Sequence, residues 1–132
     1  MIYKTRISLL ALHFTIFKCA VSPSGDKIFV TSNLPPKVLT LARDYTVLRT
    51  VTDPDIEFPW GVHVTALGQV LVGVGELRTI LQLNGEGKKK LATLATERDE
   101  IYQPCSVNYN RSTASIIVGQ WDSNNILVFQ VK

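Results

Sequence analysis

The sequence predicts an all-β protein built from three similar units in a row, because one apolar pattern recurs at a nearly constant spacing. Ile28 recurs 42 residues later as Val70, which recurs 46 residues later as Ile116. The full pattern comprises Ile28, Val30, Val38 and Leu41, then Val70, Val72, Ile80 and Leu83, then Ile116, Val118, Ile126 and Phe129. A period in the low forties, made of short apolar strands, is typical of a β-propeller blade. The sequence therefore predicts a partial propeller of about three four-stranded antiparallel blades.

Each unit divides into short strands separated by turns. The second unit predicts strands at 61–65, 69–73, 79–83 and 89–94, each with alternating apolar or β-branched residues. Its turns fall at 66–68, 74–76 and 84–87, where glycine and asparagine accept the positive φ angles of tight hairpins. The first unit has turns at 22–26, 32–36 and 43–45, and the third at 110–113 and 122–125. The third unit ends after its third strand.

We place the three blades at about 19–54, 55–100 and 101–132, which leaves residues 1–18 as an N-terminal segment. Within that segment, 7–12 is predicted to form a strand. The alternative is a signal-like segment, because Lys4 and Arg6 precede an apolar stretch. As a strand it could supply the missing outer strand of the third blade, or of the same blade in a partner chain.

The size and composition allow a soluble core but not a closed ring. The chain has 132 residues, of which 45% are hydrophobic and 19% charged. Propellers have about four blades or more, and an open arc would leave apolar sheet faces in water. We therefore expect either a piece of a longer protein or an oligomer subunit, with a homodimer that completes a six-blade ring as one arrangement. The apolar stretch near the N-terminus is too short for a membrane helix, so no membrane association is expected.

The second unit carries a recognisable motif. Phe58-Pro59-Trp60-Gly61-Val62-His63-Val64 is followed by a glycine turn at Gly68 and an isoleucine strand from Ile80. The third unit repeats this frame from Pro104 to Phe129, whereas the first keeps only its later part, from Gly25. This pattern resembles the NHL repeat, as in the propeller at the C-terminus of tripartite-motif proteins, which normally has six blades.

The resemblance implies a non-enzymatic module that binds a protein partner, such as the substrate-recognition part of a ubiquitin-ligase system. The ligase activity would require a RING domain elsewhere. Cys19, Cys105, His13 and His63 lack the close paired spacing of a zinc-bound RING. The two cysteines fall in different units, so we expect buried free thiols, which favours a reducing, cytoplasmic location.

Candidate partner-binding residues lie in or near the connections between blades, 55–60 and 98–104, because loops commonly carry recognition. These candidates are Asp55, Glu57, Trp60, His63, Arg98 and Tyr102. The alternative is RNA binding, since 14 basic residues against 11 acidic ones give a net charge of +3. Its candidates are Arg78, Lys88, Lys89, Lys90, Arg98 and Trp121. Trp60 and Trp121 are expected to pack between blades rather than to form exposed stacking platforms.

A third reading is a fragment of a metal-dependent hydrolase propeller of the gluconolactonase-like type. His63 and Asn108 occupy corresponding positions of two inner strands, and Glu57 lies near in sequence. Hard divalent ions need several oxygen ligands that converge on one point, and half a ring offers too few. The sequence also lacks a Gly-x-Ser-x-Gly nucleophile elbow. We therefore predict no catalytic or metal-binding residues and no cofactor.

Overall fold

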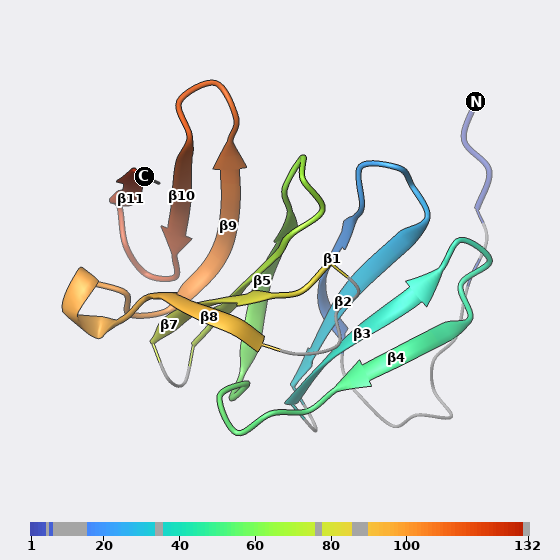
Figure 1. Ribbon diagram of the computed structural model, residues 1–132, viewed down its shortest axis with the longest axis horizontal. Helices are drawn as coiled ribbons and strands as arrows, with labels where there is room; N and C mark the ends of the chain where they lie inside the picture. The colour runs from blue at the N-terminus through green and yellow to red at the C-terminus, as the bar shows by residue number, and fades with distance from the viewer. Residues whose placement is uncertain (5, 7–15, 34–35, 76–77, 86–89, 131–132) are drawn as a thin grey trace.

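The computed structural model describes residues 1–4, 6, 16–33, 36–75, 78–85 and 90–130, and within them it shows three antiparallel sheets. Blade 1 consists of β1 (Ile16–Val21), β2 (Lys27–Asn33), β3 (Pro36–Ala42) and β4 (Val47–Val51). Blade 2 consists of β5 (Pro59–Val64), β6 (Val70–Val74), β7 (Thr79–Leu83) and β8 (Lys90–Ala95). Blade 3 consists of β9 (Pro104–Asn110), β10 (Ser115–Gln120) and β11 (Ile126–Gln130). Figure 1 shows the three blades side by side in an arc.

The predicted all-β, partial-propeller architecture is confirmed. The strands of blade 2 agree with the predicted ones to within two residues, and the third blade has three strands. The largest shift is at β5, which begins at Pro59 because a bulge between Pro59 and Val62 lengthens this strand. The strand expected at 7–12 lies outside the described residues.

The three blades share one register, which explains the repeat spacing. Phe29 of β2 pairs with Thr40 of β3, and 42 residues later Leu71 pairs with Gln82. In blade 3 the corresponding pair is Ile117 with Val128. Directly opposed residues share a face of the sheet, so equivalent positions in successive blades point toward the same side of the arc.

The core lies between the blades. The cluster between blades 1 and 2 contains Phe29, Val38, Val51, Ile56, Val64, Val70, Val72, Val74, Leu81 and Leu83. The cluster between blades 2 and 3 contains Leu71, Ile80, Ala95, Ile101, Val107, Ile116 and Val118. Each fully buried aliphatic or aromatic side chain contributes about 1.5–3 kcal/mol. A third cluster, of Val30, Leu39 and Leu41 with Ile28 beside it, lies on the other face of blade 1.

The inner strand of blade 2, β5, lies close to both neighbouring blades. The Thr31 hydroxyl of β2 donates a 2.8 Å hydrogen bond to the Trp60 carbonyl of β5. On the other side, a Cβ at Gly61 would lie 3.0 Å from the backbone of Cys105. Glycine at this position therefore allows β5 and β9 to approach.

Helical structure is scarce in the described residues. A short 3₁₀ helix, η2 (Glu97–Asp99), lies in the connection from β8 to β9. Its capping box pairs the Thr96 side chain with the backbone of Asp99 and the Asp99 side chain with the backbone of Thr96. Across the described ranges, no helix has the length and apolar character needed to span a membrane.

Blade 3 leaves one face without cover from any described residue. Ile126 and Val128 of β11 are 67% and 56% exposed, whereas Val38 and Ile80, which are equivalent to Ile126 in blades 1 and 2, are 0% and 1% exposed. Ile117 lies on the same side, because it pairs with Val128. We call Ile117, Ile126 and Val128 the open face. β11 is also the edge of its sheet, and no described strand pairs with its outer side.

Close contact between β6 and β9 predicts a strong difference between two nearby glycines. A Cβ at Gly73 would lie 2.8 Å from the carbonyl oxygen of Pro104, whereas at Gly75 the nearest atom is 3.4 Å away, on Phe58. We expect Gly73→Ala to lower the free energy of unfolding by about 1–3 kcal/mol, because the blades must shift apart. Gly75→Ala should leave it nearly unchanged. Urea unfolding measures both, and equal effects would contradict this packing.

Candidate functional site

The connection from β4 to β5 holds two of the predicted partner-binding residues, Asp55 and Glu57, and a third, Trp60, lies at the start of β5. Asp55 forms an ion pair with Lys90 of β8, and this hydrogen bond raises the pKa of Lys90. Glu57 is exposed. Trp60 is half-buried and meets Phe58 edge to face, with ring centroids 5.8 Å apart and an interplanar angle of 64°. Asp55 thus links the connection to the outer strand of blade 2.

The connection from β8 to β9 holds two more candidates. The guanidinium of Arg78 lies over the ring of Tyr102, with its central carbon 4.3 Å from the centroid. The Arg78 Nη1 also lies 2.9 Å from Glu97 Oε1. Arg98 is exposed on η2, where its backbone N–H donates to the Thr96 hydroxyl. Arg78 thus covers one face of Tyr102 and shares its charge with a carboxylate.

Tyr102 and Trp121 line one shallow cavity of about 330 Å³ at the end of blade 3. Its other lining residues are Gln103, Gln120, Asp122 and Ser123. Gln120 holds the connection in place, because its Oε1 accepts from Tyr102 N at 2.6 Å and its Nε2 donates to the Glu100 carbonyl at 3.2 Å. Trp121 is 58% exposed, so the expectation that it packs between blades is wrong. It follows β10 directly, in the last blade, where no described sheet covers it.

Among the residues that the structure describes, two of the RNA candidates already pair with carboxylates. Lys88 and Lys89 lie outside these residues. Lys90 and Arg78 each pair with a carboxylate, of Asp55 and Glu97 respectively. These pairs reduce the positive charge available to phosphate groups.

The inner strands carry the residues of the metal-hydrolase reading. His63 on β5 is half-buried, and burial lowers its pKa. Asn108 on β9 is exposed, and its Nδ2 lies 3.5 Å from Ser106 Oγ. In the part of the chain that the structure describes, no three His, Cys, Asp or Glu side chains form a group that could hold a metal ion.

The two cysteines are free thiols, but the prediction that both are buried is wrong. Cys19 is exposed and Cys105 is half-buried. Both line one cavity of about 130 Å³, with Gly61 among the other lining residues. Cys19 lies on β1 and Cys105 on β9, and both are edge strands of their sheets. No described strand pairs with the free edge of β1 or β9, which leaves these thiols less covered. The Cys105 thiol lies 3.7 Å from the Gly119 carbonyl, to which it donates.

A larger cavity, which the sequence analysis missed, lies between blades 2 and 3. It has a volume of about 400 Å³ and we call it the interblade cavity. Its lining residues are Thr65, Ala66, Leu67, Gln69, Leu71, Gln82, Leu94, Tyr109, Arg111 and Ile116. Leu71 and Ile116 also belong to the core cluster, so the cavity continues the packed interface toward the turns 65–69 and 110–114. One sequence difference between the two interfaces is the pair of equivalent residues Phe29 and Leu71, of which Leu71 has the smaller side chain.

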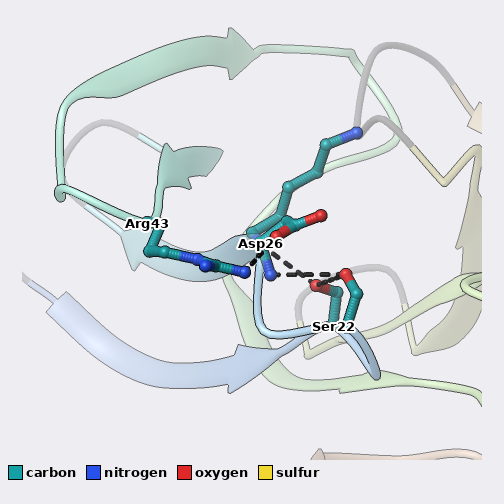
Figure 2. Close-up of polar contacts among 5 residues, drawn as sticks. Ser22, Asp26 and Arg43 are labelled. Carbon is teal, nitrogen blue, oxygen red and sulfur yellow. Dashed lines mark hydrogen bonds and ion pairs between the residues drawn. The ribbon is translucent and has the colours of Figure 1, made fainter.

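The matching end of the interface between blades 1 and 2 is polar. The β1–β2 turn carries Ser22 and Asp26, and Arg43 from the β3–β4 turn lies 2.5 Å from Asp26 Oδ1 (Figure 2). Ser22 Oγ accepts from the backbone N–H of Lys27 at 3.0 Å. The crevice beside this turn, of about 310 Å³, includes Ser22, Ser24, Asp26 and Lys27 in its lining. This end of the first interface thus carries an ion pair, which the described lining of the interblade cavity lacks.

Comparison with known proteins supports the fold. No family profile and no curated protein matches the chain. Hydrazine synthase of Kuenenia stuttgartiensis superposes with a TM-score of 0.74 at 18% identity, over 88% of this chain and 32% of that one. The dihydro-haem d1 dehydrogenase NirN gives 0.65 at 15%, over 89% and 26%. A virginiamycin B lyase from Staphylococcus aureus gives 0.62 at 14%, over 88% and 41%.

The chain therefore spans between about a quarter and two fifths of the length of these proteins. The neighbours are propeller-like, which supports the assignment of a partial β-propeller. At such low identities the likeness shows the fold alone, and the chemistry of these enzymes does not carry over to this chain.

The burial of His63 predicts a pH dependence of stability. Its pKa is lowered from the ordinary value of 6.5 in the folded protein, so the unfolded chain binds more protons there as the pH falls below 6.5. The contribution of neutral His63 to the free energy of unfolding should be complete above pH 6.5. It should decrease as the pH falls through the folded-state pKa of His63. His63→Gln should remove this part of the decrease.

Urea unfolding between about pH 7.5 and about 5, where histidine titrates, measures this contribution. His13→Gln is the matched control, because it removes the other histidine of the chain. If the free energy of unfolding depended on pH to the same extent in His63→Gln and in the unaltered protein, this result would contradict the burial of this imidazole.

Proposed function

We propose that the chain is an NHL-like interaction module that binds a protein partner and does not itself catalyse a reaction. The observation that supports this proposal is the open face of blade 3. At the position of Ile126, the equivalent side chains Val38 and Ile80 are removed from water by the next blade, but Ile126 and Val128 are not covered by any described residue. Contiguous exposed apolar surface of this kind commonly marks a protein interface.

The open face is uncharged. None of the strands β9, β10 and β11 contains Asp, Glu, Lys or Arg. Beside the apolar residues of the open face lie Ser106 and Asn108, which pair with Gly119 and Ile117. Such a face favours a partner without charge, because a buried charge with no counterpart is costly.

The two interfaces inside the chain show which kind of surface packs against a sheet face of this type. Phe29 and Val38 of blade 1 pack in one cluster with Val70 and Val72 of blade 2. Leu71 and Ile80 of blade 2 pack in the same way against Ile116 and Val118 of blade 3. We therefore propose that the occupant of the open face is a polypeptide that presents an uncharged apolar β-sheet surface.

Two exposed aromatic residues form a second candidate contact in blade 3 and the connection before it. Trp121 and Tyr102 line a common cavity, and Arg78 lies over Tyr102. Trp, Tyr and Arg are the residue types that contribute most energy at protein interfaces. A protein is favoured over RNA here, because Arg78 already pairs with Glu97 and Asp122 adds an acidic group to the cavity.

A lysine on the open face tests the proposal. Val128→Lys should reduce partner binding by about tenfold or more, since an unpaired charge would be buried in the interface. The matched control is Leu48→Lys, because Leu48 is a similarly exposed apolar residue, 50% accessible, on β4 of blade 1. Neither substitution should alter thermal stability appreciably.

The measurement has two parts, capture of proteins by the immobilised chain with quantitative mass spectrometry, and the mass in solution by light scattering. A protein retained by the unaltered chain and by Leu48→Lys but lost from Val128→Lys supports the proposal. A dimer that Val128→Lys converts to a monomer also supports it and identifies the partner as a second copy. Identical retained proteins and identical mass in all three variants would overturn it.

A further inference from the structure

We propose that the interblade cavity is a binding site for a small amphipathic carboxylate, whose apolar tail lies between blades 2 and 3 and whose carboxylate pairs with Arg111. The site is separate from the open face, because it lies on the other side of blade 3. It therefore goes beyond the protein-binding role proposed above.

The walls of the interblade cavity come from opposed strand pairs. On blade 2, Leu71 of β6 lies directly opposite Gln82 of β7. On blade 3, Tyr109 of β9 lies directly opposite Ile116 of β10. Each pair projects from one face of its sheet, and Leu71, Tyr109 and Ile116 meet in the same cluster. The walls are therefore held by the sheets themselves, and the volume of about 400 Å³ falls in the range of small-molecule pockets.

At one repeat position on the blade that faces the next, the second interface has a smaller side chain than the first. Phe29 of blade 1 is fully buried against blade 2. At the equivalent position of blade 2, Leu71 faces blade 3 with a smaller side chain. The second interface therefore has an aliphatic side chain where the first has an aromatic ring. The apolar tail of a ligand can occupy the interblade cavity beside Leu71.

The polar groups that line the interblade cavity favour a ligand whose apolar tail ends in a carboxylate. Arg111, in the β9–β10 turn, is the only charged residue among the described lining residues. Within the described part of the chain it has no ion pair, whereas Arg43 at the corresponding end of blade 1 pairs with Asp26. Guanidinium binds a carboxylate through two parallel hydrogen bonds. The amides of Gln69 and Gln82 also line the cavity and can donate further hydrogen bonds.

Octanoate and 1-octanol are the probes, because they share an apolar tail and differ in the carboxylate. We expect octanoate to bind the unaltered chain and to shift the backbone NMR signals of 65–69 and 110–116, and 1-octanol to bind more weakly at the same place. Arg111→Gln should weaken octanoate binding by about tenfold and leave 1-octanol unchanged. Arg43→Gln is the matched control, at the same end of the molecule, and should change neither affinity.

Leu71→Phe tests the apolar part of the site. It places in blade 2 the residue that blade 1 has at the same repeat position, and it should abolish binding of both probes while the thermal midpoint is kept or raised. If this variant fails to fold, Arg111→Gln still decides the question, since residue 111 lies in an exposed turn. Failure of octanoate to bind, binding equal to that of 1-octanol, or binding unaffected by Arg111→Gln would overturn the proposal.

Discussion

The structure depends on the packing of one β-sheet face against the next. A blade of this kind has apolar residues on both faces, so it is stable only between two other surfaces. Blade 2 meets this condition fully, because Val70 and Val72 face blade 1 while Leu71 and Ile80 face blade 3. The common register of the three blades keeps this alternation in phase. The cavity, the glycine contacts and the open face are all consequences of how well each such interface is filled.

Much of the fold could be predicted from the sequence, because burial between blades imposes apolar residues at fixed repeat positions. The recurrence of Val38, Ile80 and Ile126 is a local property of the chain, and it locates the third strand of each blade. The same argument could not predict exposure, because Ile126 has the same residue type as Ile80 and only the presence of a neighbouring sheet distinguishes them. Trp121 and Cys19 were assigned to the interior for this reason, and both are exposed.

The candidate sites were harder to predict than the fold. The sequence identifies Asp55, Arg78 and Tyr102 as residue types suited to binding. Their partners depend on contacts between distant segments, because Asp55 pairs with Lys90, and Arg78 pairs with Glu97 and lies over Tyr102. The interblade cavity was missed because a leucine in a strand suggests a filled core. Its volume depends on side chains of blades 2 and 3 together, among them Leu71, Tyr109 and Ile116. A binding site between repeats is therefore a property of two blades together and has no motif of its own.

The bare edge of β11 has a consequence for how the chain behaves when it is concentrated. Natural sheet edges are usually shielded by lysine, proline or a bulge, which prevents them from recruiting further strands. The sequence Ile-Leu-Val-Phe-Gln of β11 has none of these, and it combines strong β-propensity with no net charge. Two copies that met at this edge could extend one sheet through backbone hydrogen bonds alone, with no need for side-chain recognition. A strand that paired with this edge would therefore also prevent such ordered self-assembly.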